Sequence, residues 1–181
     1  MSSNVYLWLV SEDGSTEIKG NSNSAGKNSD SKDLKGSIEV VSWSHGFSQP
    51  TTAATKSSDQ QATSRANHSD LSFTKFFDDA SDDIVKACWT GQQLKTATFC
   101  MYRASGNVET GGGATEYLKI TMEDVIISHY SISGGGDELP IENITLNYTK
   151  IEYKFTPVTE EDGKAGKPVP ISHDLGTNTV S

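Results

Sequence analysis

Cysteine is scarce in this chain of 181 residues, which contains only Cys88 and Cys100. The two do not form a CxxC pair, and neither has a histidine nearby at metal-ligand spacing. The count therefore gives no cysteine-based metal motif. Because disulfides are rare in reducing compartments, we expect two free, buried thiols, with a single disulfide as the alternative.

Long apolar runs are absent as well. No stretch approaches the roughly 20 residues that a transmembrane helix needs. The first residues, MSSNVYLWLVSEDG, have neither a basic start nor an apolar run long enough for a signal peptide. We therefore expect no membrane insertion and no export through the general secretory route.

Positive charge is in deficit. Lys and Arg number 15 against 24 Asp and Glu, which gives a formal net charge of −9. A protein that binds nucleic acid neutralises phosphates with a basic face, and the Lys and Arg residues of this chain form no dense cluster. The composition predicts that nucleic acid is not a partner.

Motifs of metal sites are missing too. The four histidines, His45, His68, His129 and His173, lie too far apart in the sequence to form a local metal motif, and no HExxH segment occurs. We interpret His45 as an ordinary residue on the face of a strand. No metal and no cofactor are expected.

Catalytic motifs are equally hard to find. The glycine triplets at 111–113 and 134–136 are not followed by Lys-Ser or Lys-Thr, so they indicate turns and not phosphate-binding loops. No GxSxG motif is present, and the acidic pairs at 123–124 and 160–161 lie in turn-like segments. A hidden pair of catalytic carboxylates would need a defined spacing in three dimensions and stays open as the alternative. The sequence predicts a protein that is not an enzyme.

What the sequence does contain is a set of short apolar runs separated by long polar stretches. The hydrophobic fraction is 34% and the mean hydropathy −0.49, which together with this clustering is typical of a β-rich domain with long loops. The length fits one domain over residues 1–181. The predicted fold is mainly β, a β-barrel of two packed sheets with one flanking α-helix.

Strands are expected where apolar residues alternate or cluster. These segments are 4–10, 37–47, 70–77, 94–103, 117–133 and 141–158. The fifth is long enough for one strand or for two with a bend near Glu123 and Asp124, and ordinary strand lengths favour the bend. In the last, the apolar phase switches, which predicts a β-bulge or a strand that crosses from one sheet to another.

One helix is expected at residues 80–89. Ser81 is the predicted N-cap, and Asp82 and Asp83 lie where the helix dipole favours negative charge. Gly91 is expected to end the helix in the left-handed conformation.

Two long polar segments separate the first strands. Residues 11–35 contain too few apolar side chains to offset their ordering entropy, so we expect a mobile loop. Residues 48–69 are too long for a hairpin turn, and loops of that length usually serve binding or are disordered.

The strand at 37–47 has two unlike faces. One carries Val41, Trp43, His45 and Phe47, and the other carries Ser42, Ser44 and Gly46. We predict that Val41, Trp43 and Phe47 pack inward.

Three segments are distinctive together: GSIEVVSWSHGFSQ at 36–49, DLSFTKFFDDAS at 70–81 and IENITLNYTKIEYKFTP at 141–157. With the tail HDLGTN at 173–178, these segments resemble the haemolysin-coregulated protein (Hcp) family of type VI secretion systems. They occur in the family's order and spacing over nearly the whole chain. Two features depart from the family pattern: residues 11–35 are longer than is common, and His45 stands where an aromatic residue is frequent.

The resemblance implies a β-barrel that forms hexameric rings, which stack into an inner tube. A contracting sheath would drive this tube, with effector proteins in its lumen, out of the cell. The implied partners are identical subunits, the sheath, the spike and effectors. The implied location is the bacterial cytoplasm during assembly, then the extracellular space or a target cell. A monomeric β-sandwich binding module and a secreted effector are the alternatives.

Within this interpretation, we expect Ser42 and Ser44 to face the lumen. The following loop is expected to contact a neighbouring subunit or ring. Its candidate residues are Gln49, Pro50, Thr51, Thr52, Gln60 and Gln61. The alternatives are that the two serines merely face solvent and that the loop makes no contact.

Overall fold

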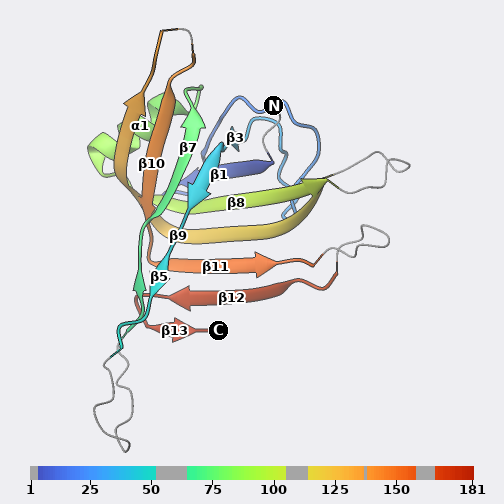
Figure 1. The fold of residues 1–181 in the computed structure, drawn as a ribbon, viewed down its shortest axis with the longest axis vertical. Helices are drawn as coiled ribbons and strands as arrows, with labels where there is room; N and C mark the ends of the chain where they lie inside the picture. Colours follow the sequence, from blue (N-terminus) through green and yellow to red (C-terminus); the bar gives the residue numbers. More distant parts are fainter. Residues whose placement is uncertain (1–3, 52–64, 105–113, 137, 158–165) are drawn as a thin grey trace, which may run out of the picture.

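The computed structural model describes residues 4–51, 65–104, 114–136, 138–157 and 166–181 (Figure 1). Within these ranges the chain forms β1 Val5–Ser11, β2 Glu17–Ile18, β3 Ile38–Glu39, β4 Ser42–Ser44, β5 Phe47–Ser48, β6 Asn67–His68, β7 Leu71–Phe76, α1 Ser81–Thr90, β8 Leu94–Ala104, β9 Ala114–Ser133, β10 Ile141–Asn147, β11 Lys150–Phe155, β12 Val169–Asp174 and β13 Thr179–Val180. The prediction of a mainly β fold with one helix is confirmed. The glycine triplet at 111–113 and the acidic pair at 160–161 lie outside the described residues.

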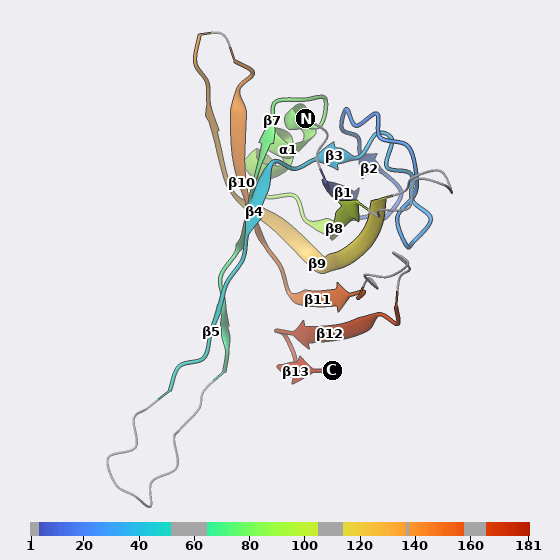
Figure 2. The same cartoon turned by 45° about the vertical axis from the view of Figure 1, so that its right-hand side comes forward.

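The long strand β9 organises the barrel because it pairs with different partners along its length. Residues 114–125 pair with β8, and part of the same stretch pairs with β11 on its other edge. Residues 126–133 pair instead with β10, which continues to β7. The segment after residue 37 connects the two ends of this strand order, because β3 pairs with β1 and β4 pairs with β7. The predicted barrel of two packed sheets is therefore confirmed, with β9 shared between the two sheets (Figure 2).

Two predictions for the second half of the chain, the bend near residue 124 and the switch of apolar phase within 141–158, concern the way β9 pairs with different strands along its length. β9 is a single strand over Ala114–Ser133, so the two-strand alternative that ordinary strand lengths favoured is wrong. The irregular backbone lies at the expected place, because Asp124 has a φ of 52°. After β10, the chain turns at Tyr148 and Thr149 and returns as β11 against the first half of β9. The switch of apolar phase is thus a crossing from one sheet to the other.

The segment at 37–47 is three short strands and not one, which corrects the sequence prediction. It must pair in turn with β1, with β7 and, in β5, with β6, so the backbone turns between the pieces. Trp43 is half-buried against the core, as expected. Val41 and Phe47, however, are each 53% exposed, so the prediction that they pack inward is wrong. Val41 lies between β3 and β4, and Phe47 lies on β5, where its ring packs edge-on against Tyr153 of β11 at a centroid distance of 5.8 Å.

The expectation of a mobile loop at 11–35 is also wrong. Ile18 and Leu34 are buried, and Leu34 joins a second apolar cluster with Tyr6, Trp8, Cys100 and Tyr102. Polar side chains supply the remaining order, because Asn28 Oδ1 accepts the backbone N–H groups of Asp30 and Lys32, both at 2.9 Å. The segment covers the face of β1 and β8 that turns away from the main core.

The helix α1 is confirmed, but its predicted cap is not. Ala80 is the N-cap and makes no side-chain capping bond, whereas Ser81 is the first helical residue and is fully buried. The Ser81 hydroxyl donates to Glu142 at 2.9 Å and accepts the N–H of Asp78 at 3.0 Å. At the other end Gly91 has a φ of 63°, as predicted.

A buried ion pair lies beneath the start of the helix. Lys75 and Glu142 are both completely buried and bonded to each other, and Lys75 Nζ also contacts Asp78 at 2.7 Å. The Tyr130 hydroxyl donates to Glu142 at 2.5 Å. Burial first, and then this bond and the carboxylate charge, raise the pKa of Tyr130. The pair joins β7 to β10 at the end of the barrel that the helix covers.

The cysteines are both free, so the disulfide alternative is not formed. Cys100 is buried and Cys88 is half-buried. Burial raises the pKa of the Cys100 thiol, and the neighbouring Glu116 carboxylate adds to the effect. Within the described part of the chain, none of the helical structure is long and apolar enough to cross a membrane.

Candidate functional site

Small polar side chains line one face of the sheet that is formed by β4, β7, β10 and residues 126–133 of β9. Ser42 and Ser44 are exposed on β4, opposite Thr74 and Ser72 of β7. Ser42 Oγ lies 2.6 Å from Thr74 Oγ1, and Ser72 Oγ lies 3.2 Å from Thr145 Oγ1 of β10. The two predicted serines therefore form the edge of a larger hydroxyl-rich surface.

This surface, which we call the polar face, extends over four strands. Its members are Ser42, Ser44, Ser72, Thr74, Asn143, Thr145, His129 and Ser131. None of these side chains is a carboxylate, an ammonium or a guanidinium group. Only the first two were predicted from the sequence, although the alternation of buried and polar residues in β7 and β10 also indicates the members on those strands.

The residues predicted for ring contacts begin where the chain leaves the barrel. The strands β5 and β6 pair through Phe47↔His68 and Ser48↔Asn67 and form an arm that points away from the barrel (Figure 2). Gln49, Pro50 and Thr51 follow on this arm and are exposed. Thr52, Gln60 and Gln61 lie outside the described residues.

Most of the large exposed apolar residues among those described form two groups on separate parts of the molecule. The first group, the edge patch, consists of Phe155, Val169, Ile171 and Val180 on β11, β12 and β13. The second group, the hairpin patch, consists of Phe76, Phe77, Ile132, Leu139 and Ile141 around the β9–β10 hairpin and the end of β7. The hairpin and the edge strands lie at different ends of the fold (Figure 1). Exposed apolar groups of this size mark interaction surfaces.

Three histidines that are distant in the sequence meet at the root of the arm. His45 Nδ1 lies 2.5 Å from the Tyr153 hydroxyl, and His45 Nε2 lies 2.7 Å from the Tyr148 hydroxyl. His68 Nδ1 lies 2.9 Å from the same Tyr148 hydroxyl, and His68 Nε2 lies 2.8 Å from His173 Nδ1. His45 is therefore part of a network, which the interpretation of His45 as an ordinary face residue did not foresee.

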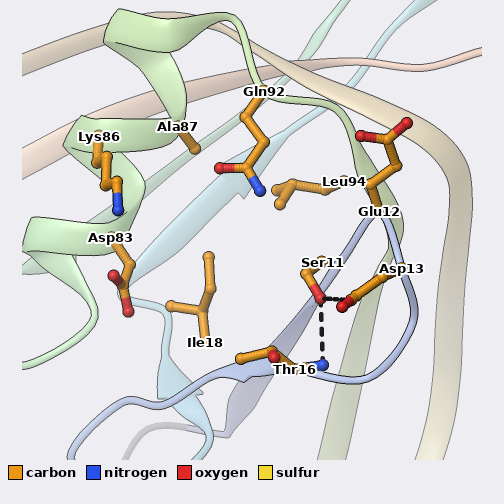
Figure 3. Close-up of a pocket in the computed structure, with 10 residues that line it drawn as sticks. All are labelled: Ser11, Glu12, Asp13, Thr16, Ile18, Asp83, Lys86, Ala87, Gln92 and Leu94. Atoms are coloured by element: carbon orange, nitrogen blue, oxygen red, sulfur yellow. Dashed lines mark hydrogen bonds between the residues drawn. The ribbon is translucent and has the colours of Figure 1, made fainter.

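A pocket lies between the β1–β2 turn and α1 (Figure 3). Glu12, Asp13 and Asp83 give it an acidic rim, and Lys86 stands beside them. The Ser11 hydroxyl, followed by that of Ser15 and the Ser15 backbone N–H, lowers the pKa of Asp13 to about 2. These bonds stabilise the turn between β1 and β2.

The described residues contain no group of three or more His, Cys, Asp or Glu side chains that could hold a metal ion. What the geometry offers is a set of surfaces: an uncharged polar face, two apolar patches and an arm. This combination suits association with other protein surfaces.

Comparisons with known proteins agree with this picture. Residues 6–155 match the family described as "Type VI secretion system effector, Hcp". The chain is 31% identical over 115 residues to protein hcp1 of Pseudomonas aeruginosa, an alignment that covers 63% of this chain and 68% of that protein.

Solved structures show the same similarity. A type six secretion system protein superposes with a TM-score of 0.80 at 25% identity, over 99% of this chain and 100% of the other. The Hcp1 protein from the E. coli pathovar EAEC 042 gives a TM-score of 0.68 at 27% identity, over 96% and 99% of the two chains. Hcp1 from Salmonella typhimurium has the same fold, with a TM-score of 0.68 at 24% identity over 98% and 99%.

Proposed function

Because the chain belongs to the Hcp family of type VI secretion proteins, a structural and non-enzymatic family that forms tubes, we propose that it is a subunit of hexameric rings that stack into the inner tube. The match over residues 6–155 carries this proposal. The chain would act as one domain over residues 1–181. It would assemble in the bacterial cytoplasm, with the sheath and spike as partners, and leave the cell with effectors inside.

The two apolar patches support ring formation. A closed ring is built from head-to-tail interfaces, which need two different complementary surfaces on each subunit. The edge patch and the hairpin patch are different surfaces on separate parts of the fold. Each would cover the other on a neighbouring subunit, and the exposed apolar side chains would be removed from water.

The polar face is suited to a lumen. Short hydroxyl and amide side chains on β4, β7, β10 and β9 leave a wide, uncharged surface, so charged effectors of either sign could pass without strong attraction or repulsion. We therefore assign Ser42 and Ser44 to the lumen wall.

The solution mass of the purified protein, measured by light scattering, tests the assembly. We expect six times the monomer mass, and negative-stain images of the same fraction should show six-fold rings. A strict monomer at high concentration would contradict the proposal and favour a stand-alone binding module.

The lumen assignment is tested in the same images. A Ser44→Cys variant, coupled to a maleimide gold cluster, should show the label in the central hole of each ring. Cys88 is half-buried and Cys100 buried, so the unsubstituted protein treated in the same way is the control for background labelling. Label on the outer wall would overturn the assignment.

The arm is proposed to join successive rings. Replacing residues 52–64 by a short Gly-Ser linker should leave the unfolding midpoint and the ring mass unchanged, because β5 and β6 remain. It should raise the protein concentration needed for ring stacking by roughly tenfold or more, the factor for about 1.4 kcal/mol of lost contact energy. The same linker in place of residues 158–165 is the control, and unchanged stacking of the arm variant would refute the role.

A further inference from the structure

The histidine cluster at the root of the arm can be assigned proton by proton. A carbonyl oxygen only accepts hydrogen bonds, and the Ser69 carbonyl lies 3.0 Å from His45 Nε2. His45 Nε2 therefore carries the proton, and in the neutral ring Nδ1 is left to accept the Tyr153 O–H. His45 is satisfied on both sides with a single ring proton.

The same reasoning continues through the other two rings. The His45 Nε2–H is shared between the Ser69 carbonyl and the Tyr148 oxygen, so the Tyr148 hydrogen is donated to His68 Nδ1. His68 then donates from Nε2 to His173 Nδ1. His173 in turn donates from Nε2 to Asn178 Oδ1 at 3.3 Å. The chain of bonds is complete when each histidine carries one ring proton, which is the neutral form.

We propose that this His45–His68–His173 cluster, with Tyr148 and Tyr153, is a pH-sensitive latch that holds the root of the arm on β11 and β12 in its neutral form and releases it in mild acid. The latch joins elements that no strand pairing connects. His45 and His68 belong to the arm root, whereas Tyr153 lies on β11 and His173 on β12. The proposal concerns a single subunit and does not depend on ring formation.

An added proton has no place in the network. Protonation of His173 on Nδ1 sets two N–H groups against each other across the 2.8 Å contact with His68. Protonation of His68 on Nδ1 places two N–H groups, His68 Nδ1–H and His45 Nε2–H, against the Tyr148 oxygen. The Tyr148 hydrogen then loses its acceptor on His68. In each case an existing bond must break.

The surroundings also favour the neutral form. Burial is the largest effect on His45 and lowers its pKa, and the neighbouring His68 lowers it further. The Ser69 carbonyl and the Asp70 carboxylate raise the pKa of His45 but do not cancel the lowering. Burial likewise lowers the pKa of His68, with further lowering from His173 and Arg65. Burial raises the pKa of Tyr153 to about 12 and also raises that of Tyr148, so both hydroxyls keep their hydrogens at neutral pH.

The direction of the pH effect follows from these shifts. A histidine with a folded pKa below its unfolded value of about 6.5 contributes full stability above pH 6.5. Between that value and the lowered folded pKa, the released state binds more protons, so the latch weakens as the pH falls. Loss of the latch is therefore expected below about pH 6.5 and not above it.

Hydrogen–deuterium exchange of the full-length protein tests the latch. Peptides covering residues 44–51 and 65–70 should lose protection between pH 7.5 and 5, after correction for the intrinsic exchange rate, because the released state binds more protons than the latched state. Peptides of β8 should not change. Equal protection of the arm root at both pH values would overturn the proposal.

A His68→Phe variant removes the central titrating ring and keeps an aromatic side chain. Its arm root should show a much smaller pH dependence, whereas His129→Gln, a change at an exposed histidine outside the cluster, should leave the wild-type dependence intact. Because the variant tests the latch only if it folds, NMR titration of the wild-type imidazoles is the second measurement. A pKa of His45 or His68 at or above 6.5 would contradict the latch even without the variant.

Discussion

Replacing Lys75 by methionine should lower the free energy of unfolding by about 3–5 kcal/mol, the usual cost of leaving one member of a buried ion pair alone. Lys75 and Glu142 are completely buried and bonded to each other. Methionine has a similar length but no charge, so the Glu142 carboxylate would keep only its bonds from Ser81 and Tyr130. Urea denaturation at neutral pH measures the loss.

Two variants separate the ion pair from general effects of losing a lysine. Lys150→Met removes a cation whose bond to Glu123 is exposed, and it should leave the free energy of unfolding nearly unchanged because solvent screens an exposed ion pair. The double variant Lys75→Met/Glu142→Leu should recover part of the loss, because no charge is then left buried. A loss below about 1 kcal/mol for Lys75→Met alone would show that the pair does not hold β7 to β10.

The fold was predictable where local patterns coincide with strand pairing. Alternation identified the long strands, and the phase switch after residue 147 identified the crossing between sheets, because each sheet buries one face. The irregular point in β9 could be placed at Glu123 and Asp124, but the strand continues past it to 20 residues, which ordinary strand lengths did not predict. The polar side of β4 followed from the same alternation, which is why the exposure of Ser42 and Ser44 could be predicted.

The remainder depends on contacts that are distant in the sequence. The covering segment at 11–35 has too few apolar residues for composition to indicate order, and its order comes from Asn28 and from side chains of β1 and β8. The histidine network joins residues 45, 68 and 173, and no spacing rule connects them. Ser81 looked like a cap because the buried carboxylate that binds it lies 61 positions away.

Trp8 tests whether the 11–35 segment is a structural part of the barrel. Trp8 is 1% exposed, packs in the second apolar cluster and donates from Nε1 to the Asp33 carbonyl at 3.3 Å. Trp8→Ala should therefore cost about 3–5 kcal/mol of unfolding free energy, as expected for a large buried aromatic side chain. Hydrogen exchange of residues 22–36 should rise in this variant while the core strand β10 stays protected.

The chain provides its own control in Trp89, which is 84% exposed on α1. Trp89→Ala removes the same side chain and should change the unfolding free energy by no more than about 0.5 kcal/mol. Trp8→Phe keeps most of the packing and loses the bond to Asp33. Its loss of unfolding free energy should therefore lie between those of Trp8→Ala and Trp89→Ala. If Trp8→Ala behaved like Trp89→Ala, the segment would contribute little to stability, and the mobile loop expected from its composition would be the better description. A large difference between the losses of unfolding free energy in Trp8→Ala and Trp89→Ala would instead mean that the polar segment is held in place. One aromatic side chain beneath the segment would then hold it together with hydrogen bonds that its composition does not reveal.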